Sequence, residues 1–467
     1  MTAVQPSTHA STDAMRASAG KHLWRHFAEM GEVGRPALPI MVRGEGCYLI
    51  DSEGNRYLDG ISNLFCVNLG YGFGSEFAAA AAAQYEELGY HSSWGSTHPR
   101  AIELAEKVAS LAPEGMERVF FTPSGGESVE AAWKLARQYH LARGEHRWKA
   151  IGRYNAYHGT TLGALSINGL PELRRPFEPL VPQVAHVRNT ARFGRPADET
   201  DEQFTAGLLA NLEEAIIAED PTTIAMVIME PVQNHGGCLT PPPGYPEGVR
   251  ALCDKYGILL VADEVICAFG RIGAWFASER YDMRPDIITT AKGLSSSHAV
   301  IGAVIASEKV YEPFSKPGIH FTHGNTFGGH PIQAAIALKN LEIMEREGIP
   351  QHVRAKEGEL GDRLRTLLDL PIVGDVRGAG YFFGIELNAS RPDGTPFTPE
   401  ERMQLFGPAS LADRLAERGL LSRISIDGDD PVMFAAPPLV ADTDEFTTIV
   451  DVMTEVLGLV GDEAAAL

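Results

Sequence analysis

The sequence predicts an α/β fold, with a mostly parallel central sheet and a second α+β lobe formed by both termini. Between residues 118 and 307, short apolar runs rich in β-branched residues alternate with amphipathic segments of helical spacing, which is typical of parallel strands joined by crossover helices. The alternation fades after about residue 345, and residues 41–60 carry the pattern of antiparallel strands. We therefore expect an N-terminal arm with part of the small domain at 1–75, a large domain at 76–344 and a C-terminal small domain at 345–467.

An arm, a helix and a hairpin are expected in the first 60 residues. Residues 1 to about 20, rich in Ser, Thr and Ala, are expected to form a mobile arm, and Lys21–Met30 (KHLWRHFAEM) has the spacing of an amphipathic helix. Residues 41–60 contain two alternating runs joined by an Asp-Ser-Glu-Gly turn at 51–54, which predicts a hairpin. We expect the sheet of the second lobe to include these strands.

The central and C-terminal elements follow in order. Strands are predicted at residues 118–122, 149–154, 223–229, 258–262, 286–290 and 299–307, and helices at 75–89, 99–111, 128–142, 205–218 and 245–256. Beyond residue 345, helices are predicted at 357–370, 409–418 and 442–459, and strands at 381–387 and 432–439.

Composition excludes several classes of partner. With 40 Lys+Arg against 61 Asp+Glu, the net charge of -21 argues against nucleic acid and anionic membranes. Neither a signal-peptide core nor an apolar run long enough to span a bilayer is evident, so a cytoplasmic enzyme is expected. The five cysteines are scattered and never form a Cys-x-x-Cys pair, which indicates reduced thiols and no zinc site.

Two residues suggest the chemistry. Asp263 follows the run 258–262, and Lys292 follows the run 286–290, so both are expected at the carboxyl edge of the sheet, where open α/β sheets bind ligands. Pyridoxal phosphate (PLP) chemistry needs such a pair: the lysine carries the aldehyde as a Schiff base, and the carboxylate keeps the pyridine nitrogen protonated. The alternative is an ordinary strand-end aspartate and a solvated lysine.

Other polar residues are predicted at the same edge. Pro123–Glu127 (PSGGE) joins a strand to a helix, so its free N–H groups could bind a phosphate, although a plain turn is the alternative. Tyr157 and Val265 could grip a flat ring from its two faces, and Glu230 adds a carboxylate. Core packing could explain either apolar contact alone.

Later residues offer a hydroxyl and a cation. Thr326, in HGNTFGGHP, could bond a phosphate, whereas the nearby His320, His323 and His330 match no metal-binding spacing. Arg423 is expected where a strand of the second lobe begins. It is either a solvated charge or a bidentate partner for a substrate carboxylate.

The motifs together resemble the class III aminotransferases, PLP enzymes of fold type I, and in particular their omega-amine:pyruvate branch. The motifs that carry the likeness, between about Leu23 and Leu457, are SNLFCVNLGYG, FFTPSGGESVEAAWKLAR, YNAYHGTT, MEPVQNHGG, ILLVADEVICAFGRIGAWFA, PDIITTAKGL and HGNTFGGHP. The resemblance implies that the domain at 76–344 binds PLP, with Lys292 as the Schiff-base lysine and Asp263 as the partner of the pyridine nitrogen.

The resemblance assigns the remaining site residues as well. The implied cofactor-binding residues are Gly125, Gly126, Tyr157, His158, Glu230, Val265 and Thr326. Thr326 would come from the neighbouring subunit, which implies a homodimer with shared sites, or a dimer of dimers. Phe65 and Trp94 would line the substrate pocket, and Arg423 would bind a substrate carboxylate.

The implied reaction is transfer of an amino group from an amine or omega-amino acid to an oxo-acid, with pyruvate as the expected acceptor, by a ping-pong mechanism. Alternatives are an aminomutase, racemase or lyase of the same fold, or a non-catalytic member. Departures from the family pattern concern the substrate: Gly126 replaces a usual Ser, Thr or Ala, Phe65 replaces a frequent Trp, and residues 297–300 read SHAV instead of small-Tyr-x-Pro.

Overall fold

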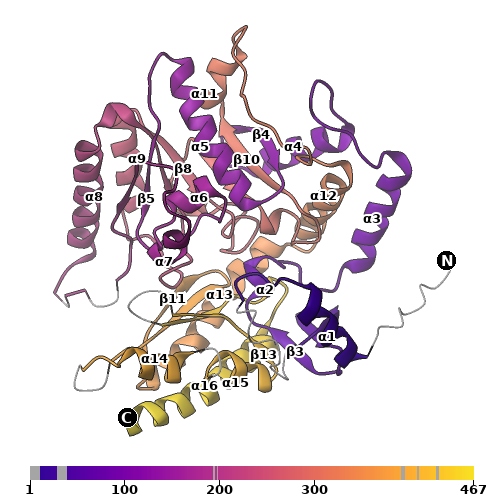
Figure 1. Cartoon of the computed structure of the whole chain (residues 1–467), viewed down its shortest axis with the longest axis vertical. Helices are drawn as coiled ribbons and strands as arrows, with labels where there is room; N and C mark the ends of the chain where they lie inside the picture. Colours follow the sequence, from indigo (N-terminus) through magenta and orange to yellow (C-terminus); the bar gives the residue numbers. More distant parts are fainter. Residues whose placement is uncertain are drawn as a thin grey trace.

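A computed structural model describes residues 11–28, 39–192, 195–196, 198–390, 395–407, 410–426 and 431–467, and it contains three sheets (Figure 1). A seven-stranded sheet with its helices fills the upper part of the view. Both smaller sheets and the C-terminal helices lie below it.

The central sheet has the strand order β4-β10-β9-β8-β7-β5-β6. Its strands are β4 (Met116–Thr122), β5 (Lys149–Arg153), β6 (Val184–Val187), β7 (Ile224–Met229), β8 (Leu259–Asp263), β9 (Ile287–Thr290) and β10 (Gly302–Ser307). Only β10 runs in the opposite direction to the other six strands, so the prediction of a mostly parallel sheet is confirmed. Every residue of β7, β8 and β9 is buried, which explains why these strands read as continuous apolar runs.

Helices cover both faces of this sheet. The longer ones are α3 (Gly74–Glu87), α4 (Pro99–Leu111), α5 (Gly125–Ala142), α8 (Asp201–Ala218), α9 (Tyr245–Tyr256) and α12 (Pro331–Arg346). The short ones are α6 (Leu162–Ile167), α7 (Pro171–Arg174), η2 (Arg175–Phe177), η3 (Pro221–Thr223), α10 (Ala277–Arg280), η4 (Lys292–Leu294), α11 (Glu308–Tyr311) and η5 (Glu312–Ser315). Alternate residues of β8 belong to two different core clusters: Leu259 and Val261 pack with α5, whereas Leu260 and Ala262 pack with α8, α9 and α12.

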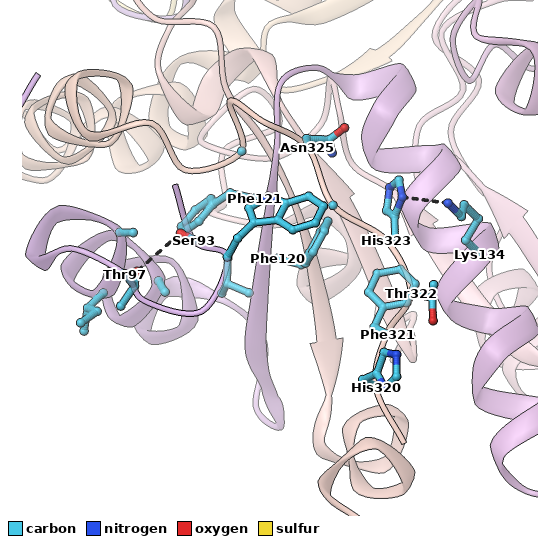
Figure 2. Close-up of a pocket in the computed structure, with 17 residues that line it drawn as sticks. Ser93, Thr97, Phe120, Phe121, Lys134, His320, Phe321, Thr322, His323 and Asn325 are labelled. Atoms are coloured by element: carbon cyan, nitrogen blue, oxygen red, sulfur yellow. Dashed lines mark hydrogen bonds between the residues drawn. The ribbon is translucent and has the colours of Figure 1, made fainter. Parts of the chain in front are cut away.

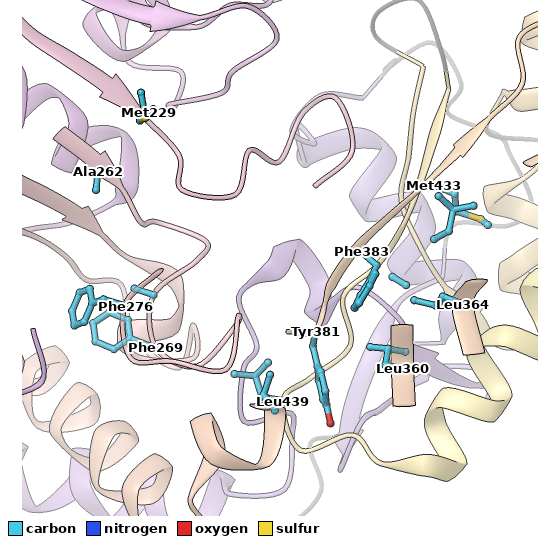
Figure 3. Packing of buried hydrophobic residues seen from close by; sticks show 14 of the residues in the cluster. Met229, Ala262, Phe269, Phe276, Leu360, Leu364, Tyr381, Phe383, Met433 and Leu439 are labelled. Carbon is cyan, nitrogen blue, oxygen red and sulfur yellow. The ribbon is translucent and has the colours of Figure 1, made fainter. Parts of the chain in front are cut away.

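The second of these clusters continues into the C-terminal part of the chain. Figure 3 shows it running from Met229 and Ala262 at the ends of the central strands, past Phe269, to Tyr381 and Phe383. The central sheet and the C-terminal elements therefore share one apolar core, which fixes their relative position.

Two four-stranded sheets form the rest of the fold. One contains β1 (Met41–Glu45), β2 (Tyr48–Asp51), β3 (Arg56–Asp59) and β13 (Leu420–Leu421), and the other contains β11 (Val373–Ala379), β12 (Phe382–Leu387), β14 (Ile424–Ser425) and β15 (Val432–Ala435). Their helices are α13 (Ile349–Arg365), η6 (Thr366–Asp369), α14 (Pro399–Phe406), α15 (Ala412–Glu417) and α16 (Thr443–Ala466).

The termini meet in the first of these sheets, because β13 pairs with β3. The predicted hairpin is the β2–β3 pair, extended by β1. The N-terminal strands form a sheet of their own with β13, however, and do not join the C-terminal sheet, which corrects that part of the prediction. The domain boundaries at residues 75 and 344 stay a prediction.

The N-terminal segment differs from expectation. Helix α1 spans Thr12–His22, inside the expected mobile arm, and ends where a helix from Lys21 to Met30 was predicted. Ser11 caps α1, and Arg16 donates two hydrogen bonds of 3.0 Å to Glu53 in the β2–β3 turn, so the helix is anchored to the first sheet. Trp24, 83% exposed, follows the helix and packs into no core, and Met30 lies outside the described residues. One further short helix, α2 (Ser62–Phe65), follows β3.

None of the helices in the described ranges combines the length and the apolar character needed to cross a membrane.

Candidate active site

A cavity of about 690 Å³ opens at the carboxyl ends of β5, β7 and β8. Every residue assigned to the site from the sequence lines it, apart from Thr326 and Trp94: these are Phe65, Gly125, Gly126, Tyr157, His158, Glu230, Asp263, Val265, Lys292 and Arg423. Phe65 and Arg423, the first and last of these residues, are 358 positions apart in the sequence. The parallel strands bring their polar end residues to one edge.

Asp263 is the last residue of β8 and is 4% exposed. Its Oδ1 accepts hydrogen bonds of 3.1 Å from the Val265 N–H and from Thr289 Oγ1, and its Oδ2 lies 2.7 Å from His158 Nδ1. Because an ionised carboxylate only accepts hydrogen bonds, His158 Nδ1 is the donor. The carboxylate is therefore held in one orientation at the edge of the cavity.

Lys292 begins the turn that follows β9, with a φ of 37°, a conformation that side-chain-bearing residues adopt at a cost. Its Nζ is 5.9 Å from the centre of the Phe65 ring. Burial lowers the pKa of the Lys292 amine, and the positive charge of Arg423 lowers it further, whereas Cys66, Asp263 and Glu230 oppose the shift. A lysine with a lowered pKa is suited to act as a nucleophile and a base.

The start of α5 forms another wall. The helix begins at Gly125, three residues earlier than predicted, with Ser124 as its cap. A Cβ atom on Gly125 would lie 2.8 Å from Val265 Cγ1, so only glycine fits there without displacing Val265. On the other side of this helix end, a Cβ on Gly126 would be 3.8 Å from the hydroxyl of Thr161, which is buried and has no hydrogen-bond partner among the described residues.

Glu230 connects two loops that border the cavity. Its Oε2 accepts from the Asn234 N–H at 2.9 Å and its Oε1 from the Tyr157 N–H at 3.4 Å. Burial raises the pKa of the Glu230 carboxyl. The side chain therefore fixes the backbone of the residue expected to contact the cofactor ring.

Several cavity residues were not found from the sequence. Besides Thr161, they include His26, Phe27, Asn234 and His235. His235 was within reach, because it lies in the MEPVQNHGG motif only five residues after Glu230. Its contact with Arg423, however, joins positions 188 apart and gives no local signal.

Trp94 and Thr326 lie elsewhere on the chain. Trp94 is 68% exposed and lines a separate depression of about 870 Å³ together with Phe120 and His323 (Figure 2). Thr326 is near it: its carbonyl accepts a 2.8 Å hydrogen bond from Tyr90. Within one chain Trp94 does not line the cavity that contains Lys292, and its place in the substrate pocket stays a prediction.

One histidine of this depression, His323, contacts a lysine. In Figure 2 the His323 ring faces Lys134, and the two nitrogens are 2.8 Å apart. Within the part of the chain that the structure describes, no three His, Cys, Asp or Glu side chains are grouped to hold a metal ion.

Comparison with known proteins decides the family. The sequence model of the family described as Aminotransferase class-III matches residues 30–457. The chain belongs to the class III aminotransferases. A probable aminotransferase of Mycobacterium tuberculosis is 48% identical over 95% of this chain and 94% of its own length. A putrescine–pyruvate aminotransferase of Pseudomonas aeruginosa is 34% identical over 98% of each chain.

A solved structure agrees with this family. The omega-transaminase of Pseudomonas jessenii, in complex with PMP, has a TM-score of 0.90 at 32% identity and covers 97% of this chain and 99% of its own. Class III aminotransferases are PLP-dependent, so this aminotransferase uses PLP, and its fold is the fold type I predicted from the motifs.

The cavity suits that cofactor. The partnerless hydroxyl of Thr161 beside the N–H groups that begin α5 is a donor set for a phosphate. At the other side, a fixed carboxylate and an amine of lowered pKa match the pyridine nitrogen and the aldehyde.

Proposed function

We propose that this aminotransferase is an omega-transaminase that moves an amino group from an amine or omega-amino acid to an oxo-acid, pyruvate, in two half-reactions of a ping-pong mechanism. The observation that carries the proposal is that Lys292 and Arg423 line one cavity with Asp263. The amine provides the proton-transfer group, and the guanidinium provides a partner for the carboxylate that pyruvate has. A relative that is 34% identical over 98% of this chain is a putrescine–pyruvate aminotransferase, which favours an amine and an oxo-acid as the substrate classes here.

Each part of the cofactor would be held by a different group of cavity residues. Gly125, Gly126 and Thr161 would hold the phosphate, Tyr157 and Val265 the two ring faces, Asp263 the pyridine nitrogen and Lys292 the aldehyde. When bound, PLP supplies a ring that accepts electrons from the carbon bearing the amino group. His158 would keep Asp263 oriented through their 2.7 Å hydrogen bond.

Lys292 would move the proton between the substrate carbon and its own Nζ. The lowered pKa of its amine favours the neutral form, which can accept a proton and return it. Phe65 is 1% exposed and packs edge to face against Phe382 and Phe434, with ring centres 5.4 and 5.5 Å apart. It would form a rigid apolar wall beside the amine.

Arg423 precedes β14 and would bind the oxo-acid carboxylate through a bidentate contact. The amine donor need not carry a carboxylate, so in that half-reaction the guanidinium would have no contact to make with the substrate. A long side chain entering from the C-terminal part of the chain can withdraw toward solvent in that half-reaction.

Donor and acceptor added separately test the reaction. The holoenzyme given an uncharged amine alone should release a stoichiometric amount of ketone or aldehyde per subunit, with no free ammonia. Pyruvate added afterwards should yield the same amount of alanine. Ammonia release from the first mixture, or isomerised amine without ketone, would instead indicate a lyase, aminomutase or racemase.

The proposal includes a homodimer, or a dimer of dimers, in which each site is completed by the other chain. Thr326 and Trp94 do not line the cavity of their own chain. The exposed Ile102 lines the depression beside them, and the exposed Tyr90 and Phe327, which contact each other, are near its lining residues in sequence. Such a surface is typical of a subunit interface. A partner subunit seated there could supply Thr326 to the phosphate.

Mixed dimers test this sharing. Co-expressed Lys292→Ala and Thr326→Ala chains should form dimers with one intact site, provided that Thr326 serves the other chain. Isolated mixed dimers should then recover about half of the wild-type turnover, whereas cis use of Thr326 leaves no intact site. Light scattering of the wild type measures the oligomeric state directly.

The proposed location is the cytoplasm. All five cysteines are free thiols, and four of them are buried, as expected for a protein kept in a reducing compartment. Fractionation of the native cells, with activity assayed in each fraction, tests this location.

A further inference from the structure

Arg423 lies against a buried histidine. Its Nη2 is 3.3 Å from His235 Nε2, and both residues line the cavity that contains Lys292. Because a guanidinium only donates hydrogen bonds, Nε2 is the acceptor. The imidazole therefore carries no proton on Nε2.

The second ring nitrogen fixes the tautomer. Nδ1 of His235 is 3.4 Å from the side-chain amide of Asn234, whose Oδ1 is buried and has no partner among the described residues. With Nε2 accepting, a neutral ring carries its proton on Nδ1 and needs an acceptor there. Rotating the Asn234 amide by half a turn places Oδ1 next to that N–H and satisfies both groups.

His235 remains uncharged beside the arginine. It is 4% exposed, and burial, together with the charges of Arg423 and Lys292, lowers the pKa of its imidazole to about 3. A carboxylate in this place would pair with Arg423 and cancel most of its charge. A neutral acceptor holds the guanidinium through a hydrogen bond and adds no negative charge beside it.

The position of His235 is itself fixed. The preceding residue, Asn234, donates its N–H to Glu230, and Gln233 and Leu239 exchange two backbone hydrogen bonds of 2.9 and 2.8 Å across the loop. The ring packs against Tyr157 with centres 5.4 Å apart and an angle of 31° between planes. A rigid acceptor can orient a flexible arginine.

We infer that His235 is a positioning residue for the oxo-acid half-reaction, holding the Arg423 guanidinium at the cavity so that it meets the substrate carboxylate. This inference rests on the proposed function, because it takes Arg423 as the carboxylate partner. An arginine that is already held loses less conformational freedom when a carboxylate binds, so affinity for the carboxylate rises. Because His235 acts through Arg423, its replacement should leave the half-reaction with an amine that has no carboxylate nearly unchanged.

A double-mutant cycle on the holoenzyme tests the coupling. His235→Phe keeps a ring beside Tyr157 but removes the acceptor, His235→Gln keeps an acceptor, and Arg423→Ala removes the guanidinium. The probe is propionate, a carboxylate without a carbonyl group to react, with its Kd measured by calorimetry. We expect His235→Phe to weaken propionate about 5- to 10-fold and His235→Gln to stay within about twofold of wild type.

The double variant gives the decisive comparison. In the Arg423→Ala background, His235→Phe should cause no further loss of propionate binding. In kinetic assays of the single variant, KM for pyruvate should rise by the same factor as the propionate Kd, while the half-reaction with an uncharged amine changes less than about twofold.

Two results would overturn the inference: an unchanged propionate Kd in His235→Phe, or an effect of the same size with and without Arg423. If His235→Phe does not fold to holoenzyme, His235→Leu removes the same acceptor with a smaller side chain and is judged by the same two results. Propionate binding needs no turnover. A wild type that releases no ketone from an amine would therefore refute the proposed function, while the cycle would still measure the coupling of His235 to Arg423.

Discussion

The two glycines that begin α5 should respond differently to an added methyl group. On Gly125 a Cβ would lie 2.8 Å from Val265 Cγ1 and 3.1 Å from Cγ2, both closer than van der Waals contact. On Gly126 the nearest atom would be Thr161 Cγ2 at 3.5 Å, an ordinary contact. Both residues are helical, so neither substitution is opposed by the backbone.

The size of the effect on PLP binding follows from the clash at Gly125. Relieving it shifts Val265, the side chain proposed to hold one face of the cofactor ring, and overpacking of this kind costs about 1 to 3 kcal/mol. At about 1.4 kcal/mol per tenfold, Gly125→Ala should raise the Kd for PLP roughly 10- to 100-fold. Gly126→Ala should change it by less than about threefold, since alanine is also the better helix former.

Absorbance titration of the apoenzymes with PLP measures both Kd values, and thermal unfolding of the apoenzymes controls for stability. Gly126→Ser is a third variant, whose hydroxyl adds a phosphate donor and should tighten binding. The reasoning fails if Gly126→Ala loses as much affinity as Gly125→Ala, or if Gly125→Ala binds PLP like the wild type.

Four further substitutions have defined outcomes. Lys292→Ala should lose at least about 10²- to 10⁴-fold in turnover, the usual contribution of a general acid/base, and near-normal steady-state turnover would contradict its role. Asp263→Asn should still bind PLP in the same titration but slow turnover by about 10²-fold or more, because a neutral amide does not keep the ring nitrogen protonated. Burial raises the pKa of Glu264 from 4.5 to about 7, so the folded state retains a proton that the unfolded state releases. Wild-type stability should therefore fall relative to Glu264→Gln by roughly 3 kcal/mol as pH rises from 4.5 to 7, and parallel urea curves across this range would disprove it. Arg271→Met should cost about 3 to 5 kcal/mol in the free energy of unfolding, against less than about 0.5 for the exposed Arg365→Met, because the buried guanidinium bonds three carbonyls and two side chains.

Strands were predictable where burial on both faces left an uninterrupted apolar run. β7 and β8 were found within one residue for this reason. Strand β6 was missed, because Val184–Val187 is only four residues long and has a histidine inside it. Its pairing with β5 is decided by the rest of the sheet.

Residues of the site were likewise predictable only where they carry a local sequence signal. Strand-end residues such as Asp263 and Glu230 carry a local signal, a polar side chain directly after an apolar run, and sheet topology brings them together. Arg271 shows the opposite case. Its hydrogen-bond acceptors are the side chains of Ser62 and Asn68 and the carbonyls of residues 381, 436 and 437, all more than 100 positions away in the sequence. Contacts of this kind depend on the completed fold.

The charges around Lys292 link its basicity to the substrate. Burial is the main cause of its lowered pKa; beyond that, Asp263 and Glu230 raise the value and Arg423 lowers it. In the proposed function, a carboxylate bound to Arg423 would offset the positive charge and remove part of the lowering, whereas an amine without a carboxylate would leave it in place. Lys292 should therefore hold its proton more tightly when an oxo-acid is bound than when an amine without a carboxylate is bound. The inferred role of His235 is compatible with this link, because a neutral imidazole 3.3 Å from Nη2 would orient the arginine without adding a negative charge.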